Sequence, residues 1–377
     1  MSDRDEERLA RAALSRLAEP GDPRVAGVVA ELGAAVVRDH LLAQRGPDGV
    51  LADVAARLAA VDPEGDLTRA ARLGVRFVIP GDPEWPAGLD DLTEAGTVAS
   101  RGGIPMGLWV RGRPLGELGP LVAVVGSRSA TTYGESVAAE LAAVVARAGL
   151  GVASGAAFGI DQAAHRGALG VAGATVAILA CGADRAYPVA HRKLIDHIAE
   201  TGAVVSEAPP GCAPTRIRFL SRNRLIAAMS RGTVVVEAAA RSGALSTANW
   251  ALRLNRPLMG VPGPVTSAQS EGVHAKLRGA EAVLVTSGAD VLEMLGRPGE
   301  HLTEPARGPA RRRDRLTVRE QQVLDAVPVG RGAGADSVSR AAGIGLREVH
   351  GTLTALAERG LVVRGDHGWR LGDTARE

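Results

Sequence analysis

The chain has 377 residues and a formal net charge of +2, with 44 Lys+Arg against 42 Asp+Glu. Its length exceeds that of one ordinary domain and predicts two or three. Because the charges nearly cancel, global charge does not identify a nucleic-acid binder, and any basic surface must be local. The two cysteines, Cys181 and Cys212, form no C-x-x-C motif, which argues against a disulfide framework or a zinc site.

The composition also bears on location. The first residues, MSDRDEERLARAAL, are charged and hold no apolar signal core. No run of about 18 apolar residues occurs, so we expect no membrane span. Together with the cysteine usage, these features predict a cytoplasmic protein.

Residues 1–75 are predicted to form a small helical domain. Apolar residues recur at helical spacing over 9–17, 25–32 and 54–61, and Pro20-Gly21-Asp22-Pro23 separates the first two stripes. A SAM-like or helix-hairpin-helix-like domain that grips DNA backbone usually carries a Gly-x-Gly between its helices. The sequence GDPRVAG matches that pattern only loosely, so a plain helical bundle is favoured over a helical hairpin that contacts duplex DNA.

Residues 76–295 are predicted to form one α/β domain. Short strands are expected at 77–79 and 108–112, followed by buried apolar runs that alternate with helical patterns. Those seven runs lie at 121–125, 150–154, 175–179, 203–206, 233–237, 258–261 and 283–285. The alternation predicts an extended Rossmann-like, doubly wound and mostly parallel sheet, with its site at the carboxyl ends of the strands.

The turn after the first of these runs is a candidate phosphate site. Gly126 ends the strand, Ser127 adds a hydroxyl, and Arg128 adds a planar fork that matches phosphate oxygens. A helix is expected to follow, and its N-terminus would offer free backbone N–H groups. Neither G-x-G-x-x-G nor G-K-[ST] occurs here. An ordinary sheet-to-helix turn with a solvated arginine fits this turn equally well.

A second candidate is the basic stretch 216–231, RIRFLSRNRLIAAMSR, which holds five arginines and no acid. We expect a helix that begins near Arg222, Asn223 and Arg224, with Phe219 just before it. Arginine beside an aromatic ring suits single-stranded nucleic acid, because phosphates need neutralising and bases need a ring to stack on. The alternative is a solvated basic helix with Phe219 in the core.

The acidic residues leave several interpretations open. Asp161 and His165 lie four apart, and a helix-capping Asp is favoured over a general base or a metal pair that lacks a third ligand. Glu207 and Glu237 each end a strand, so they could perform acid/base chemistry or bind the basic stretch. Ser242-Gly243-Ala244 opens another helix and is a second possible anion site.

Residues 296–315 read as a linker and 316–377 as a winged-helix domain. The linker is rich in Pro, Gly and charge, without periodicity. Helices are expected at 316–326, 336–342 and 346–359, with a hairpin at 360–371. The last helix carries Arg347 and His350 but little positive charge. The domain could therefore recognise DNA only weakly, and docking to a protein is an equally good interpretation.

Seven segments, in this order, resemble the DNA-processing family called DprA or Smf. They lie at 122–134, 153–165, 187–188, 206–211, 219–227, 235–248 and 261–263. The resemblance covers residues 75–295 and, more loosely, the C-terminal domain. It implies a cytoplasmic homodimer, paired through the central domain, that binds and protects single-stranded DNA and helps load the RecA recombinase in natural transformation and recombination. It implies neither a cofactor, nor a metal, nor catalytic residues.

The matching motifs also imply roles for individual residues. Arg128 resembles a phosphate-binding arginine, the Arg222-Asn223-Arg224 run resembles the core of a DNA pocket, and Ser154, Gly155 and Gly159 resemble its wall. The predicted DNA-binding set is Gly126, Ser127, Arg128, Ser154, Gly155, Gly159, Phe219, Arg222, Asn223, Arg224, Ser242 and Gly243.

The central part of the chain departs from the family pattern at two places. Leu220 stands where the family usually has Pro, and His191 stands where it usually has Asn. Residues 240–244 lack the P-G-G-x-G-T loop of related nucleotide-processing enzymes. The alternative function is a nucleotide or nucleoside-phosphate hydrolase with Glu237 or Asp161 as base. The absence of that loop and the long basic stretch both favour a binding protein over it.

Overall fold

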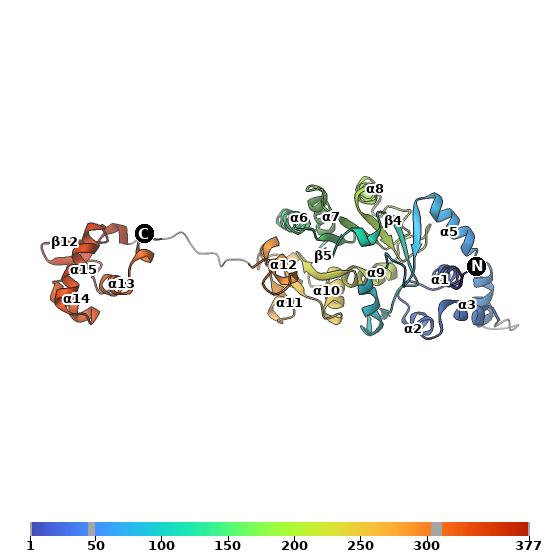
Figure 1. Cartoon of the computed structure of the whole chain (residues 1–377), viewed down its shortest axis with the longest axis horizontal. Coiled ribbons are helices and arrows are strands. Elements are labelled where there is room, and N and C mark those ends of the chain that lie inside the picture. The colour runs from blue at the N-terminus through green and yellow to red at the C-terminus, as the bar shows by residue number, and fades with distance from the viewer. Residues whose placement is uncertain (1, 44–49, 303–310, 376–377) are drawn as a thin grey trace. The chain divides into compact units, whose positions relative to one another are not determined.

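The computed structural model describes residues 2–43, 50–302 and 311–375. The chain divides into two compact units, Met1–Thr303 and Glu304–Glu377. The first is built around a large sheet, and the second is a small helical unit with a hairpin (Figure 1). The N-terminal helices belong to the same compact unit as the sheet, and the boundary near residue 75 stays a prediction.

Within the described residues, a nine-stranded sheet of order β1-β4-β8-β7-β6-β5-β9-β10-β11 forms the centre of the first unit. Its strands are β1 (Val75–Val78), β4 (Leu108–Gly112), β5 (Leu121–Val125), β6 (Gly151–Ser154), β7 (Thr175–Leu179), β8 (Ala203–Ser206), β9 (Ser230–Val235), β10 (Leu258–Gly260) and β11 (Val283–Leu284). The run from β8 to β11 is parallel throughout, which confirms the predicted sheet. The two connector strands, β1 and β4, form its antiparallel end.

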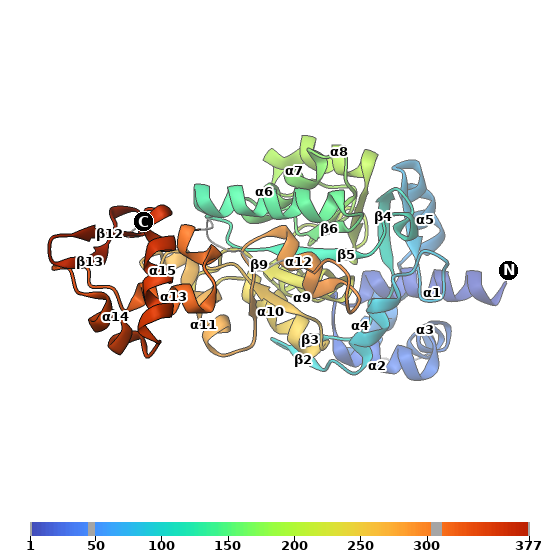
Figure 2. The same ribbon diagram turned by 60° about the vertical axis from the view of Figure 1, so that its left-hand side comes forward.

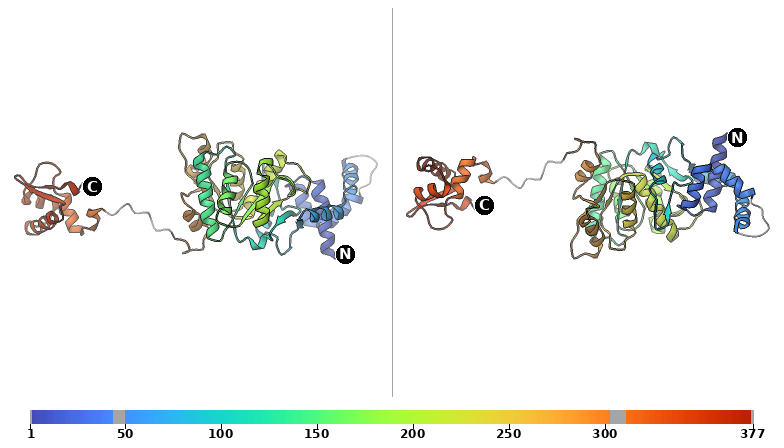
Figure 3. Two further views of the ribbon diagram at one scale, coloured as in Figure 1. Left: turned by 90° about the horizontal axis from the view of Figure 1, so that it is seen from above. Right: turned by 90° about the horizontal axis from the view of Figure 1, so that it is seen from below.

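Helices cover both faces of this sheet (Figure 2). One face carries α6 (Thr132–Arg147), α7 (Ile160–Leu169) and α8 (Arg192–Thr201), which lie side by side in Figure 3. The other carries α9 (Arg216–Ala228), α10 (Ala244–Arg253) and α11 (Glu271–Arg278). Alternate residues of β5 supply the two cores: Val122 and Val124 pack with α6 and α7, while Ala123 and Val125 pack with α9 and α10.

The N-terminal segment is more helical than its sequence pattern predicted. The described residues form α1 (Asp3–Leu17), α2 (Pro23–Leu32), α3 (Ala34–Ala43), α4 (Val50–Ala59) and α5 (Pro63–Arg72). The break between α1 and α2 falls at the predicted turn. The helix α3 was not predicted separately because only Gly33 stands between it and α2. The helix α5 was not predicted because its start is defined by the cap at Asp62 and by Pro63, and less by apolar periodicity.

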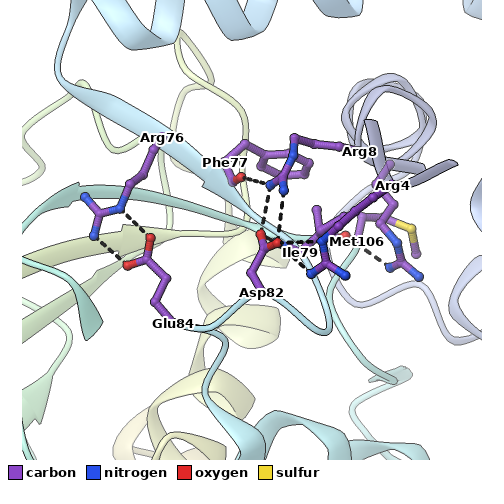
Figure 4. Close-up of polar contacts among 9 residues, drawn as sticks. Arg4, Arg8, Arg76, Phe77, Ile79, Asp82, Glu84 and Met106 are labelled. Carbon is purple, nitrogen blue, oxygen red and sulfur yellow. Dashed lines mark hydrogen bonds and ion pairs between the residues drawn. The ribbon is translucent and has the colours of Figure 1, made fainter. Parts of the chain in front are cut away.

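Asp82, in the turn after β1, holds α1 against the sheet (Figure 4). Its carboxylate accepts hydrogen bonds from Arg8 Nη1 over 2.8 Å, from Arg4 Nη2 over 2.7 Å and from the Ile79 backbone N–H over 2.8 Å. Burial raises the pKa of Asp82, but these hydrogen bonds outweigh burial and lower it to about 2. The ionised carboxylate therefore stabilises the fold.

Replacing Asp82 by Asn should lower the free energy of unfolding of the first unit by about 1 kcal/mol at neutral pH. Because folding lowers the pKa of Asp82 from 3.8 to about 2, the stabilisation is complete above about pH 5 and is lost as pH falls through about 2. Urea denaturation at several pH values should show the two proteins converging at low pH. A stability difference that stays constant down to pH 2 would contradict this account.

The second unit has the winged-helix arrangement that the sequence predicted. It contains α13 (Val318–Asp325), α14 (Ala335–Ala342) and α15 (Leu346–Glu358), followed by the hairpin β12 (Val362–Gly365) and β13 (Gly368–Leu371). Gly343 ends α14 in the left-handed conformation that favours glycine. Several arginines of these helices pair with acids, including Arg359 with Glu320 at 2.9 Å. None of the helices in the described parts of the chain is long and apolar enough to cross a membrane.

Candidate nucleic-acid interface

A cavity of about 760 Å³ opens at the carboxyl ends of β5 and β9. The strands β6, β7 and β8 follow β5 on one side of the sheet, whereas β10 and β11 follow β9 on the other side. The strand order therefore reverses between β5 and β9, and such a switch point is where α/β sheets bind ligands. The walls come from five segments far apart in the sequence: 125–129, 157–161, Tyr187, 214–226 and 239–247. Of the predicted set, Gly126, Ser127, Arg128, Phe219, Arg222, Asn223, Ser242 and Gly243 line this cavity.

The turn after β5 presents Arg128 but not a free helix N-terminus. The helix α6 begins only at Thr132, and a protein carboxylate already lies at its capping residue, because Glu237 accepts from the Thr131 N–H over 2.9 Å and from the Thr131 hydroxyl over 2.6 Å. The predicted phosphate site at that helix end thus already faces a carboxylate, which disfavours a phosphate there. Arg128 itself is exposed, and its guanidinium carbon lies 4.6 Å from the centre of the Phe219 ring.

Three predicted wall residues lie behind the cavity lining. Ser154 is fully buried, and its hydroxyl donates to the Val124 carbonyl over 2.7 Å. Gly155 leaves room for a guanidinium, since a β-carbon there would overlap Arg222. Gly159 has φ +73°, and a β-carbon there would overlap the Ser127 carbonyl. These residues shape the site without presenting side chains to it.

The basic stretch forms a helix earlier than predicted. Thr215 caps α9 by accepting the Arg218 N–H over 3.3 Å, so the helix begins at Arg216 and contains Phe219. The expectation that it starts near Arg222 was wrong, because the cap and the arginines, which are good helix formers, extend it by about a turn and a half. The helix is buried from Ser221 to Ala228, so Arg222 and Arg224 are buried whereas Arg216, at its start, is exposed.

Arg222 lies in the floor of the cavity. Its Nη1 donates to the Ile178 carbonyl over 2.7 Å, and its Nε has no hydrogen-bond partner among the described residues. Burial lowers the pKa of Arg222 to about 10, and the charge of Arg128 adds to that, while Asp161 opposes it. The side chain therefore remains cationic at neutral pH, with one donor unsatisfied.

Arg224 does not reach the cavity. Its guanidinium is fully buried and forms a bidentate ion pair with Glu207, with both N–O distances 2.7 Å. It also donates to the carbonyls of Ser221 and Gly103, and Glu207 accepts the Gly21 N–H over 3.3 Å. Of the two interpretations of Glu207, the one in which it binds the basic stretch is therefore confirmed, and Glu19 pairs with Arg218 in the same stretch. We therefore leave Arg224 out of the interface.

The acidic residues act within the protein. Asp161 is buried, which raises its pKa, and it accepts the Gly155 and Ala157 N–H groups over 3.1 and 3.3 Å; Gly159, not Asp161, caps α7. Burial lowers the pKa of His165 to about 3, and its Nδ1 contacts the Thr175 hydroxyl over 2.7 Å. Within the described ranges, no three His, Cys, Asp or Glu side chains form a group that could hold a metal.

The opposite wall carries the other predicted residues. The Asn223 amide donates to the Gly243 carbonyl over 3.2 Å, which ties α9 to the loop before α10. In that loop, the Ser242 hydroxyl accepts the Ala244 N–H over 3.3 Å, and Gly243 faces open space. The second candidate anion site therefore adjoins the cavity.

Sequence analysis missed three residues that line the cavity. Arg216 and Arg241 are exposed and form no ion pair within the described part of the chain, so with Arg128 they give it three available cations. Tyr187 is 41% exposed, and its ring centre lies 5.7 Å from that of Phe219. The sequence did indicate each of them: Arg216 is the first residue of the basic stretch, and Tyr187 and Arg241 lie in segments that resemble the family.

Comparisons with known proteins agree with this geometry. The model of the family described as DNA recombination-mediator protein A matches residues 76–296. A Mycobacterium tuberculosis protein, provisionally named DNA processing protein DprA, is 43% identical over 364 residues, which cover 95% of this chain and 92% of that protein.

Two solved structures extend the comparison. DNA processing protein A of Streptococcus pneumoniae is 29% identical, with a TM-score of 0.63 over 76% of this chain and 97% of that one. The Helicobacter pylori protein, whose structure is described as revealing its single-stranded DNA binding mode, is 27% identical, with a TM-score of 0.52 over 59% of this chain and 95% of that one. The chain therefore belongs to the DNA recombination-mediator protein A family of DNA processing proteins.

Proposed function

We propose that this protein binds single-stranded DNA in the cavity between β5 and β9. The observation that carries the proposal is the contact of Arg128 with the Phe219 ring, 4.6 Å from its centre, in a cavity that also holds Arg216 and Arg241. A phosphate and the adjoining base need these two groups side by side. The family match and the description of the Helicobacter pylori protein support the same ligand.

The charges of the cavity favour an anion. Arg128, Arg216 and Arg241 are exposed cations, and Arg222 adds a buried cation with an unsatisfied Nε donor. The acid that lines the cavity, Asp161, is buried and engaged by backbone N–H groups. The rings of Phe219 and Tyr187 suit bases that are splayed out, which single strands offer and duplexes do not.

The proposal is tested by titrating fluorescent oligonucleotides with the intact protein. Single strands should bind more tightly than a duplex of the same length, and affinity should fall as salt rises. Equal affinity for both forms would contradict the proposal.

We further propose that the protein passes single-stranded DNA to a RecA-type recombinase, as the family description indicates. In that role it protects incoming single strands during natural transformation or recombination in the cytoplasm. The test is whether the protein accelerates RecA filament formation on single strands coated with single-strand-binding protein. An unchanged rate would remove the mediator role without removing DNA binding.

A binding role is favoured over nucleotide hydrolysis. Glu237 is engaged by Thr131, Glu207 by Arg224, and Asp161 by backbone N–H groups, so each candidate base already has protein partners. We expect no turnover of nucleoside monophosphates by protein that binds single strands. Measured turnover that Glu237→Gln abolishes would restore the hydrolase alternative.

We expect a homodimer that pairs through the central domain. The sheet ends at β11, where Val283 and Leu284 are 47% and 53% exposed, so an apolar edge is available. Light scattering at micromolar concentration should report twice the chain mass. A monomer mass would contradict the expectation, and Val283→Lys should shift the mass toward the monomer if this edge is the contact.

A further inference from the structure

Three aromatic side chains of the described residues are well exposed. The chain has three Phe, two Tyr and four Trp. Trp109, Trp250 and Trp369 are core residues, whereas Tyr133, Phe158 and Tyr187 are 44%, 46% and 41% exposed. The Tyr133 hydroxyl donates to the Pro262 carbonyl, and Tyr187 already lines the cavity. Phe158 is thus a wholly apolar ring, half in solvent, that the cavity lining does not account for.

The position of Phe158 is fixed by its neighbours at the cavity rim. Ala157, just before it, lines the cavity, and Gly159, just after it, packs against the carbonyls of Ser127 and Arg128. Phe158 therefore lies in the chain between a residue of the cavity lining and a glycine that approaches the backbone of Arg128.

The ring also has a rigid support. Its centre lies 4.5 Å from that of the His191 imidazole, with the planes at 68°. His191 is 5% exposed, and its Nδ1 contacts the Ala156 carbonyl over 2.9 Å. With its oxygen toward Arg166, the Gln162 amide donates to His191 Nε2 over 2.9 Å. The buried imidazole of His191, held by these hydrogen bonds, thus supports the ring while Phe158 stays 46% exposed.

We propose that Phe158 is a second base-stacking residue, which extends the strand-binding site beyond the cavity. The proposal rests on the proposed function. Phe219 and Tyr187 stack bases inside the cavity, and Phe158 receives a base of the strand as it leaves past Arg128. Every base has a π-face, so the contact adds affinity without sequence preference. It contributes only when the strand is long enough to reach the rim.

The test is a length series of oligothymidylates, from about 4 to about 16 nucleotides, titrated by fluorescence anisotropy. For long strands, Phe158→Ala should weaken binding about 5- to 150-fold. For the shortest strands that bind, affinity should be unchanged. The slope of log affinity against log salt should stay the same at every length, because no phosphate contact is lost.

Three further variants separate stacking from structure. Phe158→Leu keeps an apolar contact with His191 but lacks the ring, so it should behave like Phe158→Ala. Phe158→Trp keeps a ring and should retain wild-type length dependence. Leu73→Ala removes a comparably exposed apolar side chain, 55% exposed, from the end of α5 and should have no effect.

The outcomes distinguish the two proposals. If the wild-type protein binds no member of the series, the proposed function fails, and this inference fails with it. If the wild type binds while Phe158→Ala and Phe158→Leu keep its affinity at every length, only the inference is overturned. 2-Aminopurine placed at successive positions should be quenched at one outer position by the wild type but not by Phe158→Leu, and identical quenching patterns would also overturn it.

Discussion

Replacing Glu207 by Gln will lower the free energy of unfolding of the first unit by about 3–5 kcal/mol, because it leaves the buried guanidinium of Arg224 without its counter-charge. Both partners of this pair are almost completely buried, at 0% and 9% side-chain exposure. Glu207 also accepts the Gly21 N–H, and the Ser221 hydroxyl donates to the Pro20 carbonyl over 2.6 Å. The pair therefore fixes α9 to the turn between α1 and α2.

Urea denaturation monitored by circular dichroism measures this effect. Glu117→Gln is the matched control, because its ion pair with Arg113 is exposed and 3.5 Å long, and such pairs contribute about 0–1 kcal/mol. The double variant Glu207→Gln/Arg224→Met should recover part of the loss, since it removes the uncompensated charge. A loss below about 1 kcal/mol for Glu207→Gln would contradict the structural role assigned to the pair.

Replacing Phe219 by Ala will weaken single-strand binding by about 1–3 kcal/mol, which is about 5- to 150-fold, if a base stacks on this ring. The substitution also removes the surface on which Arg128 lies. Because the arginine charge remains, the salt dependence of binding should change little. Anisotropy titrations at several salt concentrations measure both quantities.

Stability has to be measured alongside, because Phe219 is half-buried in α9. Phe219→Trp keeps a stacking face and should bind nearly as well as the wild type, whereas Phe219→Leu should resemble the alanine variant. Folded Phe219→Ala protein with wild-type affinity would place the base-stacking surface elsewhere.

The sheet was predictable because a strand buried on both faces leaves a continuous apolar run, such as LVAVV before Gly126. The cavity was predictable in outline for the same reason, since parallel strands bring their following turns to one edge. The sequence pattern did not show which arginines of α9 would face the cavity. Arg222 and Arg224 stand two positions apart in a basic run, and only the fold directs one toward the cavity and the other toward Glu207.

Contacts between distant segments explain the remaining differences. The N-terminus of α6 was predicted to suit a phosphate, but Glu237, which follows β9, accepts hydrogen bonds from the backbone N–H and hydroxyl of its capping residue, Thr131. The structure shows that the loops carrying Arg241 and Tyr187 line the same cavity as α9, which the sequence did not indicate. Local sequence does not show which distant loops meet, so the family motifs were the only sequence signal for these two residues.

The most direct test of the central claim is the salt dependence of single-strand binding by Arg128→Ala. If Arg128 neutralises a phosphate, its loss should lower affinity for every base composition and flatten the slope of log affinity against log salt by about 0.7. Arg147→Ala is the matched control, because this exposed arginine lies at the opposite end of α6 and should leave the slope unchanged. A folded Arg128→Ala protein with wild-type affinity and slope would show that the cavity between β5 and β9 does not bind the strand.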